Sequence, residues 1–204
     1  MPLRYAIRKI DQGVSPQAEG GLAMEAGQVG VLKSGCANGG VFLPTEHKVL
    51  PTDFVFDPAI RVEVGDLLVN RASGSVPLLG SAAIVTWNPY QLILSDKTFR
   101  IWPSGSTSRH YLYWLMNSRL YREQVEATVS GAEGLANNLP MSRLRSFRLP
   151  FPPLAEQRKL IVFLERETSA ISQAILTASR GIDLARERRA ALISAAVTGK
   201  IDVG

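Results

Sequence analysis

The longest regular pattern of apolar and polar positions lies in the last quarter of the chain. Between residues 154 and 196, apolar or small residues recur at alternating steps of three and four, which is the heptad spacing of a helix that buries one stripe against another helix. The stripe runs through Ile161, Leu164, Thr168, Ile171, Ile175, Ala178, Ile182, Ala185, Arg189, Leu192 and Ala196. Prolines before it favour a start at Pro153 or Leu154, and Gly199 can supply a left-handed stop. The pattern predicts one helix of about 40 residues, roughly 60 Å long.

Charged residues beside this stripe favour an antiparallel partner. If Ile161 is position a, the flanking e and g positions carry Glu165 and Glu167 near the start, and Arg186 and Arg188 near the end. A parallel copy would stack like charges, whereas an antiparallel copy places each glutamate beside an arginine. The same register aligns the apolar positions around a dyad between residues 176 and 177. We therefore expect two copies to pair antiparallel, and packing of the helix on its own domain is the alternative. The expected contacts are Ile161, Leu164, Ile171, Ile175, Ala178, Ile182, Leu192, Glu165, Glu167, Arg186 and Arg188.

Four apolar residues lie off the stripe, on the far side of the helix: Phe163, Leu176, Leu184 and Val197. A free dimer would expose them, and an exposed apolar stripe usually marks a binding surface. We expect Phe163 and Leu184 to bind a partner subunit. The alternative is packing against the domain of the same chain.

Shorter patterns upstream indicate strands. Residues 28–35 alternate as a strand does, and residues 36–51 are turn-rich, with Asn-Gly-Gly at 38–40 as a tight-turn signal. Residues 62–87 predict two strands joined by a loop at 70–77. Residues 92–103 predict a further strand, and we expect the side chains of Lys97 and Arg100 to lie on its outside.

Between these strands and the long helix, residues 108–128 predict one amphipathic helix, because apolar side chains recur near helical spacing. The positions are Tyr111, Leu112, Leu115, Met116, Leu120 and Val125. Residues 129–153 read as a loop. Its Arg143, Arg145 and Arg148 could hold DNA phosphates or an acidic partner, and the sequence does not decide between them.

Composition changes this picture in one respect. The 204 residues carry a net charge of +5, but residues 143–204 hold 11 Lys and Arg against 6 Asp and Glu (11 minus 6, or +5), while residues 1–142 hold 12 against 12. The strand-rich part is therefore not globally basic, and a nucleic-acid site there must depend on a local basic face. No run of residues is apolar enough for a membrane span or a signal core, so we expect a cytoplasmic protein.

Catalytic chemistry is not indicated. Cys36 is the one cysteine, which excludes an internal disulfide and favours a core position, and His47 and His110 have no metal-binding spacing. The chain has no glycine-rich cofactor loop, no DPPY or NPPY motif and no nuclease set of carboxylates with lysine; a phosphate-binding loop is also absent, because GDLLVNRASG lacks the Lys-Ser or Lys-Thr after its second glycine. These observations favour a protein that binds a ligand over an enzyme that converts a substrate.

Several polar residues fall in loops where side chains can reach DNA. Asn70 and Arg71 can each form paired hydrogen bonds, to adenine and guanine respectively, and Ser73 follows them in the same loop. Arg71 is the first choice, with a structural salt bridge as the alternative. Lys33 and Asn38, for which a solvated loop is the alternative, complete the candidate DNA-binding set together with Arg100.

The quoted patterns also carry a family resemblance. The stretches LPFPPLAEQRKLIVFLERETSAI and RERRAALISAAVTGKIDV resemble the shared helical region of type I restriction-modification specificity subunits. The resemblance extends upstream through GDLLVNRASGS, LLGSAAIV, LILSDKTFRIWP and LYWLMNS. Members usually contain two target recognition domains, each followed by such a helix, whereas this chain has one of each and resembles a half-sized subunit.

The resemblance implies an α+β fold, with a mixed α/β target recognition domain at residues 1–148 and a long coiled-coil helix with a short tail at residues 149–204. It implies a non-catalytic chain that binds double-stranded DNA, pairs with a second copy, and directs a modification (methyltransferase) subunit and a restriction subunit in defence against foreign DNA. Those partners would use S-adenosylmethionine, ATP and Mg, and this chain would hold no cofactor. Two alternatives stay open, a stand-alone dimeric DNA-binding protein and a coiled-coil interaction protein without a DNA role.

Overall fold

The computed structural model describes residues 1–23, 25, 27–129 and 137–201, which form two units. The first unit, Met1–Arg158, contains every described strand, and the second, Lys159–Gly204, contains most of one helix. Strands and helices alternate irregularly in the first unit, and a long helix follows, so the expected α+β fold is confirmed. No helix in the described part of the chain has a stretch long and apolar enough to cross a membrane.

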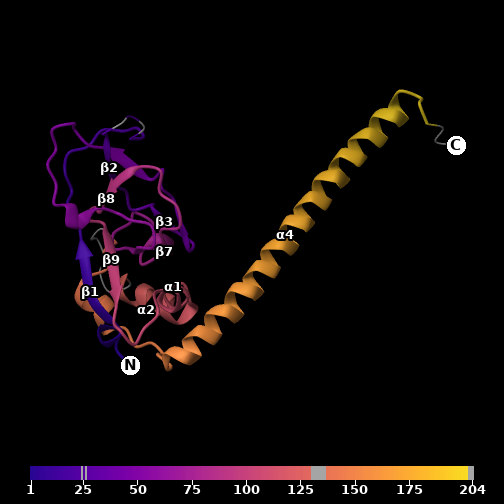
Figure 1. The fold of residues 1–204 in the computed structure, drawn as a ribbon. Coiled ribbons are helices and arrows are strands. Elements are labelled where there is room, and N and C mark those ends of the chain that lie inside the picture. The colour runs from indigo at the N-terminus through magenta and orange to yellow at the C-terminus, as the bar shows by residue number, and fades with distance from the viewer. Residues whose placement is uncertain (24, 26, 130–136, 202–204) are drawn as a thin grey trace. The chain divides into compact units, whose positions relative to one another are not determined.

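The central sheet of the first unit has four antiparallel strands in the order β1-β9-β6-β7, of which Figure 1 labels β1, β9 and β7. The strands are β1 Ile7–Gln12, β9 Thr98–Pro103, β6 Leu67–Asn70 and β7 Ala82–Ile84. All four residues of β6 are buried, as expected for a strand that is covered on both faces. The pairing of β6 with β7 confirms the two strands expected in residues 62–87.

A second sheet has three strands in the order β5-β2-β8, in which β2 is antiparallel to β5 and parallel to β8. Its strands are β2 Val29–Leu32, β5 His47–Val49 and β8 Gln91–Ile93. A separate hairpin joins β3 Ala37–Asn38 to β4 Val41–Phe42. The expected tight turn lies between them, where Gly39 and Gly40 have φ values of +55° and +86°, which residues with a side chain adopt at a steric cost.

The helices of the first unit correct two expectations. Residues 108–128 form two helices, α1 Arg109–Met116 and α2 Arg119–Val129. The break falls at Asn117, the C-cap of α1, whose side-chain Nδ2 donates to Ala82 O at 3.0 Å. Leu120 beyond the break is 47% exposed. The expected loop at 129–153 contains a short helix, α3 Met141–Ser146, and its residues 130–136 lie outside the described part of the chain. The described residues of this unit also form three 3-10 turns: η1 Leu3–Tyr5, η2 Pro58–Ile60 and η3 Val76–Leu78.

The long helix, α4 Leu154–Val197, begins and ends where the sequence predicts. Its 44 residues span about 66 Å. Gly199 has a φ of +67°, its N–H donates to Ala196 O at 3.2 Å, and the N–H of Lys200 donates to Ala195 O at 2.8 Å. This pair of bonds is the Schellman arrangement, which satisfies carbonyls that the helix leaves free at its end. The last three residues of the expected tail lie outside the described residues.

The first turn of α4 is fixed by the side chain of Gln157, which is fully buried. Its Oε1 accepts from Ser108 N at 2.8 Å, and its Nε2 donates to Ser106 O at 3.1 Å and to Pro152 O at 2.8 Å. The amide therefore satisfies donors and acceptors in two segments of the chain. This contact gives the PPLAEQ sequence a structural role at the start of the helix.

A buried arginine holds the centre of the first unit. Arg100 lies within β9, and its guanidinium donates to Asp11 Oδ2 at 2.8 Å, to Asp66 Oδ2 at 3.1 Å, and to the carbonyl oxygens of Ala59 and Arg61. The side chains of the three charged residues are between 7% and 11% exposed. The expectation that Arg100 lies outside the strand and contacts DNA is therefore wrong, because its donors are already engaged inside the fold.

The pKa of Asp11 reports the strength of this contact. Burial by itself raises that pKa, but hydrogen bonds from Lys9, Trp102 and Arg100 outweigh burial and lower it below the ordinary value of 3.8. A carboxyl whose pKa is lower in the folded chain contributes stability that is fully present above the unfolded pKa and is lost as pH falls through the folded pKa.

We therefore expect Asp11→Asn to lower the free energy of unfolding by about 1.5–3 kcal/mol at neutral pH, because it removes one of the two carboxylates that bind the guanidinium of Arg100. Urea unfolding measures this difference, which should shrink as pH is lowered below about 4. The control is Asp53→Asn, at an exposed turn, which should change stability by less than about 0.5 kcal/mol. Equal effects of the two substitutions would contradict the role of Arg100.

Candidate nucleic-acid interface

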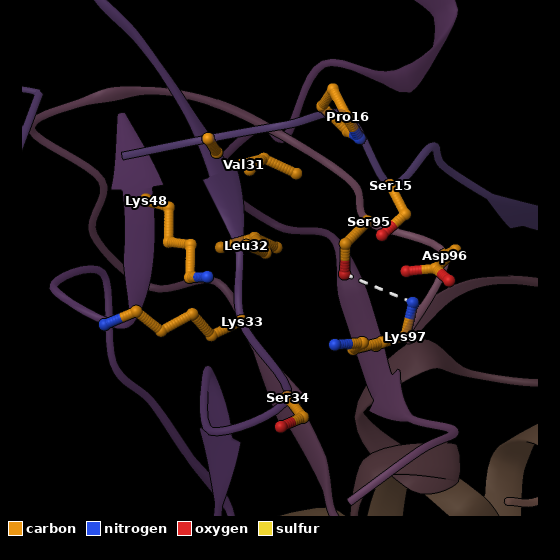
Figure 2. Close-up of a pocket in the computed structure, with 11 residues that line it drawn as sticks. Ser15, Pro16, Val31, Leu32, Lys33, Ser34, Lys48, Ser95, Asp96 and Lys97 are labelled. Carbon is orange, nitrogen blue, oxygen red and sulfur yellow. Dashed lines mark hydrogen bonds between the residues drawn. The ribbon is translucent and has the colours of Figure 1, made fainter. Parts of the chain in front are cut away.

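A pocket of about 220 Å³ lies where the chain passes from the three-stranded sheet to the four-stranded sheet (Figure 2). Four segments meet there: the chain after β1, strand β2 with the residues that follow it, strand β5, and the turn between β8 and β9. The lining residues are Ser15, Pro16, Ala18, Val31, Leu32, Lys33, Ser34, Lys48, Ser95, Asp96 and Lys97.

The turn at this pocket interrupts the single strand expected over residues 92–103. Ser95 Oγ accepts from Lys97 N at 3.3 Å, and Asp96 N donates to Val14 O at 3.1 Å, so the backbone bends away from the β8 direction. The close approach requires Gly13, because a Cβ atom there would lie 1.8 Å from Leu94 O. The same bend separates β8 and β9 into two different sheets and places three consecutive polar residues beside the pocket.

Three lysines line this pocket, and we call them the lysine cluster: Lys33, Lys48 and Lys97. Lys48 lies in β5 opposite Val31 of β2, which brings its side chain to the pocket wall beside Lys33. Lys33 Nζ lies 3.8 Å from Glu46 Oε2, but both side chains are about 41% exposed, and such pairs contribute less than about 1 kcal/mol. Lys48 and Lys97 form no ion pair with a described residue.

Such a pocket can bind phosphate groups. Ammonium groups bind phosphate oxygens as point charges, and hydroxyl and backbone donors add hydrogen bonds. The hydroxyl groups of Ser15, Ser34 and Ser95 lie in the same lining. The charge of the pocket lining is positive, because it contains three lysines and one aspartate. The net charge of residues 1–142 is zero, so this basic face cannot be deduced from the net charge of the sequence.

Two of the predicted DNA-binding residues lie at or beside this pocket. Lys33 lines it. Arg71 is half-buried behind the β8–β9 turn, where its Nη1 donates to Asp96 O at 3.2 Å and its guanidinium lies 5.3 Å from the ring centre of Phe99. Arg71 thus supports the turn. Its predicted contact with a base is not tested by this arrangement.

The other predicted residues lie elsewhere. Asn38 is exposed beside the β3–β4 turn and does not line the pocket. Ser73 is 9% exposed, and its Oγ accepts from Ser75 N at 3.1 Å. Asn70 is fully buried in β6, where its Nδ2 donates to Ala37 O at 2.6 Å. The expectation that Asn70 lies in a loop and contacts a base is therefore corrected, because Asn70 is buried in the core at the end of β6.

The structure adds Lys48 and Lys97 to the candidate phosphate-binding surface, together with Asp96 between the two sheets. Side chains alternate between the two faces of a strand, so the position of Lys48 next to His47 could have indicated that Lys48 points outward. In the structure His47 is fully buried. What the sequence does not show is that β5 and the β8–β9 turn meet at one pocket, since 47 residues separate Lys48 from the turn at Ser95 (95 minus 48).

The buried nucleophile and the buried imidazole have structural partners. His47 Nε2 accepts from Ala23 N at 2.8 Å, so the ring proton is on Nδ1, which donates to Pro44 O at 2.6 Å. Cys36 is fully buried, as expected for a core residue, and burial raises the pKa of its thiol to about 12. The described residues contain no group of three or more histidine, cysteine or acidic side chains that could hold a metal ion.

Comparisons with known proteins agree on one family. The family model of the type I restriction modification DNA specificity domain matches residues 10–178. The specificity subunit of the type I restriction enzyme EcoEI from Escherichia coli is 30% identical over 160 residues, which are 78% of this chain and 27% of that protein. The chain thus spans about a quarter of the length of this curated relative.

Solved structures share the fold. A chain from a study of complex assembly and conformational transition in the type I restriction-modification system aligns with a TM-score of 0.62, at 18% identity, over 95% of this chain and 44% of that chain. The HsdS subunit from Thermoanaerobacter tengcongensis aligns with a TM-score of 0.53, at 18% identity, over 84% and 37%. The S subunit from M. genitalium aligns with a TM-score of 0.54, at 14% identity, over 85% and 39%.

We expect Lys48→Gln combined with Lys97→Gln to weaken binding to duplex DNA of any sequence, because these side chains would contact phosphates. Fluorescence anisotropy at several salt concentrations should show a shallower dependence of log affinity on log salt, by about 0.9 for each phosphate that the variant no longer neutralises. The matched variant, Arg143→Gln with Arg145→Gln, removes the same charge from the exposed surface of α3. A larger loss of affinity in the arginine variant would place the phosphate contacts on α3 instead.

Proposed function

Because the chain belongs to the family of type I restriction-modification DNA specificity domains, we propose that it reads a sequence in double-stranded DNA through the pocket with the lysine cluster. The single observation that carries this proposal is the family match over residues 10–178, which spans the whole pocket and the first half of α4. The pocket supports it independently, since three ammonium groups and one carboxylate line the same surface cavity.

We propose that the chain is non-catalytic and acts in the cytoplasm, where it directs a modification subunit and a restriction subunit to its DNA site. Those subunits would supply methyl transfer from S-adenosylmethionine and the ATP- and Mg-dependent steps. Two features support this division of labour. Both ring nitrogens of His47 are occupied by backbone groups, and burial raises the pKa of the Cys36 thiol so that it stays protonated.

We also propose that α4 pairs antiparallel with a second copy. Every side chain of α4 between residues 169 and 194 is exposed in the single chain, and Ile175 at the centre of the stripe is 63% exposed. Leaving such a stripe in water forgoes about 25 cal/mol for each Å² of apolar surface that a partner would cover. Phe163 and Leu184, which lie off the stripe, are more than half exposed, and we assign them to the modification subunit.

Selection from random duplex DNA tests the reading function. The purified chain should enrich a motif made of two identical inverted halves, because a two-fold dimer presents the same pocket twice. We expect the halves to lie between one and two DNA turns apart, at about 34 Å per turn. The same preparation should transfer no methyl group to the enriched DNA. Recovery of no motif would contradict the proposed function, and a motif with unrelated halves would contradict the symmetric dimer.

Charge exchange tests the antiparallel register. Glu165→Arg with Glu167→Arg should weaken the dimer at least tenfold, because it places arginines beside Arg186 and Arg188. Adding Arg186→Glu with Arg188→Glu should restore it. The pairs that these residues form within one helix, Arg166 with Glu167 and Asp183 with Arg186, are exposed and contribute little, so they should not mask the effect.

Sedimentation equilibrium measures the dissociation constant of each variant. A parallel dimer would show no rescue in the fourfold variant, because like charges would remain side by side. A wild-type chain that sediments as a monomer would contradict the pairing proposal altogether.

A further inference from the structure

Asp96 is the acidic side chain in the lining of the pocket, and its backbone is held firmly. Its N–H donates to Val14 O at 3.1 Å, and its carbonyl oxygen accepts from Gln12 Nε2 at 2.9 Å and from Arg71 Nη1 at 3.2 Å. These partners come from β1, from the chain that follows it, and from the loop after β6. The residue is therefore fixed in position from two sides, although it lies in a turn.

The carboxylate of Asp96 has no comparable partner. Its Oδ1 is enclosed and accepts no hydrogen bond, and no ion pair within the described residues includes it. Figure 2 shows the group beside Ser15, Ser95 and Lys97 at the pocket. Enclosed acceptors without a donor are rare in folded proteins, because they lose their bonds to water and gain nothing in return. Rotation of the Asp96 side chain would bring this oxygen into the pocket, where a donor on a bound ligand would remove that cost.

The chemistry of the group restricts what that ligand is. An ionised carboxylate only accepts hydrogen bonds, so it repels phosphates, which the lysine cluster attracts. On duplex DNA the donors in the major groove are the exocyclic amines of cytosine and adenine. Adenine presents an acceptor, N7, beside its amine, and this acceptor would face the second carboxylate oxygen. Cytosine itself presents no acceptor beside its N4 amine, because the neighbouring ring position is C5–H, and the acceptor O6 of the paired guanine lies on the opposite side of the amine.

We propose that Asp96 selects cytosine at one position of each half-site by accepting a hydrogen bond from the N4 amine, while the lysine cluster holds the adjacent phosphates. This inference rests on the proposed DNA-reading function and assigns the base-reading role to one residue. The two kinds of side chain divide the work, because phosphate contacts position the duplex and base contacts specify the sequence. The lysine charges also offset the repulsion between the carboxylate and the DNA backbone.

The decisive substitution is Asp96→Asn, which keeps the shape of the side chain and leaves the three backbone hydrogen bonds in place. An asparagine amide both accepts and donates, and it matches the N6 and N7 groups of adenine. In selection from random duplexes with the full chain, the preference for cytosine at one position should fall about tenfold or more, and adenine should rise there. The other positions of the motif should not change.

Two further variants separate the outcomes. Asp96→Ala should lose the cytosine preference without a gain of adenine, which keeps the test decisive if the asparagine variant folds poorly. Lys48→Gln should lower affinity for all sequences and keep the motif. Thermal unfolding of each variant confirms that the fold is retained.

An unchanged motif in the Asp96→Asn and Asp96→Ala variants, with the wild-type chain still enriching one, overturns the role of Asp96 and leaves the proposed function intact. A wild-type chain that enriches no motif overturns both. A shift confined to one position of each half-site supports the inference.

Discussion

The contact between Arg100 and its two carboxylates is the constraint on which the strand-rich unit depends. It ties β9 to β1 through Asp11 and to the approach of β6 through Asp66. The same guanidinium binds carbonyl oxygens at residues 59 and 61, and Arg61 forms a bridge with Ile93 of the three-stranded sheet. One cation thus links two sheets, and a buried cation is tolerated only because every side of it meets an acceptor.

The pocket follows from this link. Because β8 and β9 belong to different sheets that are held together, residues 94–97 between them form a corner against the end of β1 and the β2–β5 pair. Lysines from three separate segments meet at that corner, although their part of the chain carries no net charge. The positive charge is therefore local to this corner and is not a property of the whole unit.

Features set by neighbouring residues could be predicted from the sequence, and features set by distant ones could not. The bounds of α4, its Gly199 stop and the turn at Gly39 and Gly40 depend on backbone rules that operate within a few residues. Arg100 looked like a surface residue because its carboxylates lie 34 and 89 residues away. The lysine cluster could be predicted only in part for the same reason. Lys33 lies in a loop that the sequence indicates, whereas Lys48 and Lys97 come from segments that are distant in the sequence.

The buried amide of Gln157 has a consequence for how the long helix forms. Starting a helix is unfavourable, because several residues must be ordered before the first hydrogen bond forms, whereas each later residue adds a bond at little cost. Docking of Gln157 on residues 106–108 orders the first turn as soon as the strand-rich unit has folded. Helix growth can then proceed outward from a prepared nucleus, so α4 should lose its structure progressively from the Gly199 end and persist longest beside the domain.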